Sequence, residues 1–283
     1  MLEKLDSIAW SSLSHAYGEA SDVPELMRAL VSSGRFKPDE DPIGQLSGNI
    51  WHQGTVYEAT AYAVPFLIEI AESSECNRRD EVLHLLSCIY NGTSYLEVHR
   101  PLFGEPFDEV ENARLQAELQ AELKHVAAAK KAVEAGIDNY LRIFREETDP
   151  TLKISAAHLL SNFPERREIL APLIRDALLI SENTEFQAGY IILLGQIGDD
   201  SPATEEILKQ KLLDTERSVQ VAAVICAALT KSPLISSVDI ELLKDSIEIS
   251  GFFENLPWDC EYDVDSLDWE SLLDEDTRAR LAK

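Results

Sequence analysis

Two segments, "AGYIILLGQI" at 188–197 and "VQVAAVICAAL" at 219–229, are long enough for helices and are apolar on nearly every side. A helix without a polar face must be covered from several directions, which a neighbour on one side alone cannot do. Small residues recur in both segments and allow helices to approach closely: Ala188, Gly189, Gly195, Ala222, Ala223, Ala227 and Ala228. We therefore expect these segments to be inner helices with neighbours on both sides.

The rest of the chain from Glu58 onward also alternates helix-length segments with short polar breaks, and hardly any stretch has the period of a strand. In the second half the helices fall into pairs, whose second members align at Ala156, Ala188 and Ala222, 32 and 34 residues apart. Steps of this length are typical of helix-turn-helix repeats. The sequence predicts an all-α protein, an α-solenoid of helix pairs (α/α superhelix).

The predicted organisation has two parts. Residues 1–250 form the solenoid, with an irregular N-terminal segment and an inserted loop at 91–108. Loops of this length often carry function; the slightly favoured alternative is that Phe103 and Phe107 fold back on the solenoid. Residues 251–283 form an acidic C-terminal segment with ten acids and three bases. A terminal repeat needs a polar outer surface, so this segment is expected to cap the array, with partner capture as the alternative.

Two stretches carry a family resemblance. "AVPFLIEIAESSECNRRDEVLHLLSCI" and "LAPLIRDALLISENTEFQAGYIILLGQIGD" each place a proline (Pro65, Pro172) in a first helix, then a polar turn and an apolar second helix. In this they resemble HEAT repeats, which implies an α-solenoid over roughly residues 56–250, although the step is short and the usual turn Asp and second-helix Arg are scarce. "WHQGTVYEATAYAVPFL" is similar to a stretch of bacterial HEAT-like proteins that include immunity proteins of toxin systems. That resemblance names no catalytic residue.

The charge balance restricts the partners. With 25 Lys and Arg against 51 Asp and Glu, the formal net charge of -26 repels nucleic-acid phosphates and anionic lipid headgroups. We expect a basic protein partner, with solubility as the alternative reason for the acidity. No apolar run is long enough for a membrane helix and the start, "MLEKLDSIAW", carries acids, so the predicted location is cytoplasmic.

Candidate contact residues lie in two places. Thr55 and Glu58 have the spacing of a capping box, with Gly54 turning the chain into the helix. A capping box does not explain Trp51, His52 and Gln53. We expect them to cover the N-terminal edge of the solenoid, with a role in lining a pocket as the alternative. Aromatic anchors within charged rims are typical of interfaces. The predicted partner-binding residues are Trp51, His52, Gln53, Trp258, Asp259, Glu261, Tyr262, Asp263, Asp265, Asp268, Trp269 and Glu270.

Signatures of catalysis are missing from the sequence. His84 and Cys88 stand four residues apart with Cys76 upstream, but a structural zinc site takes four ligands and this segment has the pattern of a core helix. There is no nucleophile elbow, Walker loop or dinucleotide fingerprint, and "GQIGDD" suits a helix C-cap at Gly198. We predict no catalytic residue, cofactor or metal. The leading hypothesis is a non-catalytic binding protein, most specifically an acidic immunity protein neutralising a basic toxin; the alternatives are a general scaffold or adaptor, or a lyase-type enzyme on a HEAT-like frame.

Overall fold

The computed structural model describes residues 2–32, 41–103, 108–235 and 256, and only the backbone of residues 100–103. The chain divides into two compact units, residues 1–143 and 144–283. The described part is mostly helical with little strand, which confirms the predicted all-α class. None of the helices in this part is long and apolar enough to cross a membrane.

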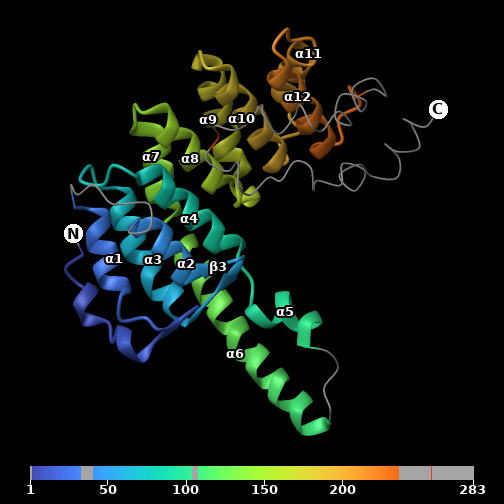
Figure 1. The fold of residues 1–283 in the computed structure, drawn as a ribbon. Helices are drawn as coiled ribbons and strands as arrows, with labels where there is room; N and C mark the ends of the chain where they lie inside the picture. Colours follow the sequence, from blue (N-terminus) through green and yellow to red (C-terminus); the bar gives the residue numbers. More distant parts are fainter. Residues whose placement is uncertain (1, 33–40, 104–107, 236–255, 257–283) are drawn as a thin grey trace. The chain divides into compact units, whose positions relative to one another are not determined.

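Unit 1 is built around α3 (Glu58–Ala71), which contacts α1 (Val23–Leu30), α2 (Pro42–Ile50), α4 (Arg79–Asn91) and α6 (Glu109–Glu134) (Figure 1). Two short 3-10 turns, Leu5–Ser7 and Trp10–Ser12, precede α1. The indole N–H of Trp10 donates to the carbonyl oxygen of Leu5 at 2.8 Å, and its ring packs on Phe66 of α3. The N-terminal segment, predicted as irregular, is thereby anchored to the helical core.

Two small hairpins also belong to unit 1. Strand β1 (Ser14–His15) pairs antiparallel with β2 (Gly18–Glu19), and β3 (Trp51–His52) pairs with β4 (Thr55–Val56). At the tip of the second hairpin both Gln53 and Gly54 have positive φ, 50° and 85°, as a type I′ turn requires. The main chain of this hairpin is extended by Thr93, whose N–H donates to Gly54 and whose carbonyl accepts from Val56.

The second hairpin corrects the predicted capping box. Helix α3 does begin at Glu58, as expected, but Thr55 lies in β4 and does not cap it. The backbone N–H of Tyr57 instead donates to the hydroxyl of Thr60 at 2.9 Å. The Glu58 carboxylate accepts from the backbone N–H of Ser14 at 3.3 Å. The spacing of Thr55 and Glu58 was misleading because the residues before Glu58 pair as strands.

The predicted loop at 91–108 contains a helix, α5 (Tyr95–Phe103), which packs along part of α6 (Figure 1). The Glu97 carboxylate accepts hydrogen bonds from the Ser94 backbone N–H at 3.4 Å and from the Ser94 hydroxyl at 3.0 Å. This local capping starts a helix where Gly and Pro suggested a loop. The expected folding-back of the Phe103 and Phe107 side chains lies outside what the structure describes.

In unit 2 the two segments that are apolar on nearly every side, 188–197 and 219–229, lie in helices that are packed against other helices. Helix α7 (Ile137–Glu146) crosses the boundary between the units, and α8 (Pro150–Ser161), α9 (Arg167–Ile180), α10 (Thr184–Gln196), α11 (Pro202–Lys211) and α12 (Arg217–Leu229) follow. Helix α10 contacts α8, α9 and α12. The seven small residues predicted to permit close approach, Ala188, Gly189, Gly195, Ala222, Ala223, Ala227 and Ala228, are all buried. A Cβ added at Gly195 would lie 2.9 Å from the Cα of Cys226, so α10 and α12 do approach closely.

The helix starts give the period of unit 2. Helices α8, α10 and α12 begin at Pro150, Thr184 and Arg217, 34 and 33 residues apart. The side chains of Asp149 and Asn183 each accept two backbone N–H bonds as N-caps of the first two. The predicted alignment on alanines, with steps of 32 and 34, is off by one or two residues because alanine recurs too often in these helices to define a register.

Candidate partner-binding surface

Tyr17 is the exposed aromatic residue that unit 1 holds most firmly. It lies in the turn between β1 and β2, and 70% of it is exposed. Its backbone N–H donates to Nδ1 of His15 at 3.0 Å, and its phenol oxygen lies 3.3 Å from Nδ1 of His52. The Tyr17 and His52 rings also meet edge to face with centroids 5.3 Å apart. The side chain is thus exposed to solvent and restrained at both ends.

The support for Tyr17 comes from a buried histidine. Nδ1 of His15 accepts the Tyr17 N–H, so the neutral ring carries its proton on Nε2, which donates to Asp22 at 3.0 Å. The other carboxylate oxygen of Asp22 accepts from Asn49 of α2 at 2.7 Å. The backbone N–H of Ala16 donates to the carbonyl oxygen of Asn49 at 3.0 Å. The hairpin that presents Tyr17 is therefore tied to α1 and α2.

The three predicted contact residues of unit 1 lie on the second hairpin. Trp51 and His52 form β3 and are half-buried, while Gln53 is exposed at the tip. Nε1 of Trp51 is buried and has no hydrogen-bond partner among the described residues. His52 makes both a polar contact and a ring contact with Tyr17.

Tyr57 joins this hairpin to α5 and α6. Its phenol group lies 2.8 Å from the hydroxyl oxygen of Thr55. Burial raises the pKa of Tyr57, the hydrogen bond with Thr55 opposes this rise, and electrostatic effects of Tyr95, Glu122 and Tyr17 add to it. Helices α5 and α6 both contact β4, the strand that precedes Tyr57. Tyr95 itself is exposed and its ring stacks on His99, with centroids 4.1 Å apart.

Helices α5 and α6, which both contact β4, each carry a carboxylate with a shifted pKa, Glu97 and Glu122. Hydrogen bonds from Thr93 and Ser94 lower the pKa of Glu97, so this exposed group stays ionised. Burial raises the pKa of Glu122, which accepts the Leu96 N–H at 2.9 Å, and the neighbouring Glu118 and Glu97 add to the shift. No ion pair found among the described residues includes Glu97 or Glu122, although the charge of Lys130 helps to lower the pKa of Glu97. We call Tyr17, His52, Tyr57, Tyr95, Glu97 and Glu122 the hairpin surface.

Aromatic faces beside unpaired carboxylates are suited to cationic side chains, which bind to both. Of the hairpin surface, only His52 was singled out in the sequence. Tyr17 was missed because 35 residues separate it from His52 along the chain, which hides their contact. The turn "AYGE" around Gly18 was the available signal for the first hairpin, and Gly18 has a φ of 125°. The remaining predicted contacts, Trp258, Asp259, Glu261, Tyr262, Asp263, Asp265, Asp268, Trp269 and Glu270, lie outside the described residues.

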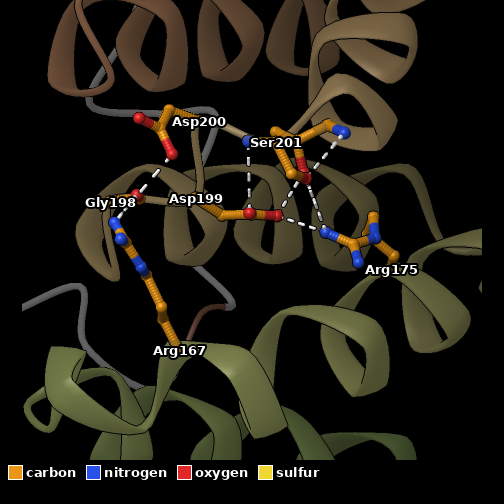
Figure 2. Close-up of polar contacts among 7 residues, drawn as sticks. Arg167, Arg175, Gly198, Asp199, Asp200 and Ser201 are labelled. Carbon is orange, nitrogen blue, oxygen red and sulfur yellow. Dashed lines mark hydrogen bonds and ion pairs between the residues drawn. The ribbon is translucent and has the colours of Figure 1, made fainter.

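Unit 2 has a second polar cluster, the Asp199 network, at the turn between α10 and α11 (Figure 2). The side chain of Asp199 is 8% exposed and pairs with Arg175 of α9, which is 19% exposed. Thr204 donates its hydroxyl to the same carboxylate, and Arg175 also donates to Ser201 and Thr204 at 3.2 and 3.3 Å. Every charged group here has a partner inside the protein.

The same turn confirms the predicted C-cap. Gly198 has a φ of 67°, its N–H donates to the carbonyl of Gly195, and the Asp199 N–H donates to Leu194 at 3.0 Å. Arg167 donates to the carbonyl oxygen of Gly198 at 3.0 Å, and Figure 2 shows it reaching the turn. These contacts join α9, the end of α10 and the start of α11.

A small hollow lies next to the Asp199 network. Its volume is about 90 Å³, and its lining includes Thr204, Glu205, Thr230, Lys231 and Ser232. Small-molecule sites are usually several times larger, roughly 300 Å³ or more. The hollow has room for waters or one side chain and supports no substrate site.

The candidate metal ligands from the sequence lie in the core. Sγ of Cys88 is 3.4 Å from Nε2 of His84, and Cys76 and Cys88 are both buried. Burial raises the pKa of Cys76, which opposes formation of the thiolate that a metal requires. No group of three or more His, Cys, Asp or Glu side chains placed to hold a metal occurs in the part of the chain that the structure describes.

Comparison with known proteins gives no relative: no family model, no curated protein and no solved structure matches the chain.

Proposed function

We propose that the chain is a non-catalytic, cytoplasmic binding protein that recognises a basic protein partner through the hairpin surface. The observation that carries this proposal is Tyr17, a residue that is 70% exposed while its backbone N–H and its phenol group are both engaged. Ordering a side chain on binding costs about 0.5–1.5 kcal/mol, and a residue that is already ordered avoids much of this. Rigid exposed tyrosines are common anchors of interfaces.

The charge of the partner follows from the carboxylates. Glu97 and Glu122 lie on α5 and α6, which both contact β4 of the second hairpin, and the whole chain carries a formal charge of -26. Lysine or arginine side chains of a partner would neutralise the carboxylates and stack on Tyr17 or Tyr95. Opposite net charges would also accelerate the encounter.

The experiment is capture of partners from the source cells on the immobilised full-length chain, followed by measurement of binding to the purified partner. Tyr17→Ala should weaken binding by about 2 kcal/mol, roughly thirtyfold, because it removes a central anchor. Tyr62→Ala is the matched control, since Tyr62 is also an exposed tyrosine of unit 1 but lies on α3 outside the hairpin surface. Equal binding by both variants would contradict the assignment of the site.

Salt tests the electrostatic part. The association rate constant should fall steeply between about 50 and 500 mM salt, because screening shortens the range of the attraction. A rate constant that does not change with salt, or a captured partner that is acidic, would refute recognition by charge.

A finer proposal is that the partner is a toxin and that the chain is its immunity protein, built as an α-solenoid of HEAT-like pairs. What supports it is the resemblance of residues 51–67, the acidic charge and the steps of 34 and 33 residues in unit 2. An acidic protein can block the basic active site of a nuclease by occupying it in place of the substrate. Co-expression with the neighbouring open reading frame should then restore growth, and Tyr17→Ala should restore it less. If the product of the neighbouring gene is not toxic, the immunity hypothesis is refuted and the general scaffold or adaptor is the hypothesis that is left.

A further inference from the structure

Three large aliphatic side chains of unit 2 are exposed at the ends of two helices. Leu179 and Ile180 at the end of α9 are 75% and 74% exposed, and Leu213 just after α11 is 83% exposed. Leu179 and Ile180 precede the turn into α10, and Leu213 lies in the turn between α11 and α12. Exposed aliphatic residues are ordinary when isolated, so their relative placement decides whether they have a role.

Hydrogen bonds hold the two turns together. Gln187 of α10 donates to the carbonyl oxygen of Ser181 at 2.7 Å and accepts from Nζ of Lys211 at 3.0 Å. Lys211 also lies 3.0 Å from the carboxylate of Asp214. These hydrogen bonds link Ser181, which follows Ile180, to Asp214, which follows Leu213. The two turns therefore form one edge, and we call Leu179, Ile180 and Leu213 the turn edge.

The two turns that carry the turn edge contain more acids than bases. Residues 179–185 and 211–217 together contain four acids and two bases. One of the bases, Lys211, is neutralised by Asp214, while Glu182 and Glu216 are exposed. Burial opposes ionisation of Asp214, but hydrogen bonds from Glu216 and Lys211 outweigh it and lower its pKa, so the carboxylate stays charged.

We propose that the turn edge docks an amphipathic segment of a basic partner protein, whose apolar side chains cover Leu179, Ile180 and Leu213 while its lysine or arginine side chains face Glu182 and Glu216. Charge selects this occupant over two others. The chain's own residues 251–283 contain ten acids and three bases, and a second copy brings a formal charge of -26, so both would be repelled. This inference takes the basic character of the partner from the proposed function but concerns a different surface.

The test uses two synthetic helical peptides of about 18 residues, one patterned with leucine and lysine and one with leucine and glutamate. The full-length chain should bind the leucine–lysine peptide and not the leucine–glutamate peptide. The double variant Ile180→Ser, Leu213→Ser should bind about tenfold more weakly, since it removes two apolar contacts. Val110→Ser is the control, because Val110 is 79% exposed on α6 of unit 1. Equal binding by both variants, or equal binding of both peptides, would overturn the proposal.

A second experiment tests the charges instead of the apolar side chains. The double variant Glu182→Lys, Glu216→Lys should bind the leucine–lysine peptide more weakly. The control is the double variant Glu165→Lys, Glu168→Lys, just before and at the start of α9, which should bind the peptide as the unchanged protein does. A photo-crosslinker at position 213 then identifies the occupant in the full chain. Crosslinks to the peptide support the proposal, and crosslinks to residues 236–283 or to a second copy overturn it. Tyr17→Ala should leave the yield of peptide crosslinked at position 213 unchanged, because that readout reports on the turn edge alone, so failure here is distinct from failure of the hairpin surface.

Discussion

The hairpin surface of unit 1 and the Asp199 network of unit 2 both gather polar side chains from several elements, but they differ in what remains available. In the network, Arg175, Thr204 and Ser201 satisfy one another and the Asp199 carboxylate, and the ion pair is largely buried. At the hairpin surface, internal contacts orient Tyr17 but leave its ring open to solvent.

The difference separates stability from recognition. A buried charge with all its partners inside the protein costs stability if any partner is removed, and it has no capacity left for a ligand. An exposed ring held by its neighbours contributes little to the core and offers a surface ready to bind. Substitutions in the network should therefore change unfolding, and substitutions in the hairpin surface should change binding.

The largest effect is expected from Asp199→Ala. Removal of this carboxylate leaves Arg175 mostly buried without its counter-charge, which should lower the free energy of unfolding by about 3 kcal/mol. Urea unfolding at neutral pH measures it. Asp200→Ala is the control, because Asp200 is exposed and its change should stay within about 0.5 kcal/mol. If the two variants unfold at the same urea concentration, the network is not the structural tie that its burial indicates.

The next prediction concerns the stability of two glycine-to-alanine variants, one in a helix of each unit. Gly195→Ala places a methyl group 2.9 Å from the backbone of Cys226 and should destabilise by about 1 kcal/mol, even after the gain in helix propensity. Gly48 of α2 has nothing within 4 Å of an added Cβ, so Gly48→Ala should stabilise by up to about 1 kcal/mol. Thermal unfolding of both variants tests the opposite signs. A stabilising Gly195→Ala would show that α10 and α12 have room to move apart.

The comparison also explains what the sequence could predict. Periodicity and small residues indicated the buried helices α10 and α12, and Gly198 indicated the end of α10, because these features depend on residues near one another in the chain. The hairpin surface depends on contacts between residues far apart, such as Tyr17 with His52 and Leu96 with Glu122. Local spacing even gave the wrong cap at Thr55, because strand pairing with Trp51 and His52 overrode it.

His52→Ala should have an effect of similar size, but on binding, and should act through Tyr17. The variant removes the contact at the phenol group, so the Tyr17 ring becomes more mobile and binding of the partner weakens by about 1 kcal/mol, roughly fivefold. Fluorine NMR of 3-fluorotyrosine at position 17 measures the motion. His99→Ala is the control, since His99 stacks on Tyr95 and should leave the Tyr17 signal unchanged. If His52→Ala leaves both the signal and the affinity as they were, preorganisation of Tyr17 is refuted.

The smallest effect is a pH dependence at Glu122. Its pKa is raised in the folded state, mainly by burial, so the folded protein holds the proton more tightly than the unfolded chain does. The ionised group therefore costs stability at neutral pH, and this cost disappears below its unfolded pKa of about 4.3. Glu122→Gln keeps an oxygen to accept the Leu96 N–H but carries no charge. It should stabilise by at most roughly 0.5 kcal/mol at pH 7, because solvent screens a partly exposed group, and by nothing near pH 4.

Glu97→Gln should give the opposite sign, since hydrogen bonds from Thr93 and Ser94 lower the pKa of Glu97 and make its charge stabilising at pH 7. Unfolding curves across this pH range that move the two variants in the same direction would show that the two carboxylates do not differ in environment as the structure indicates.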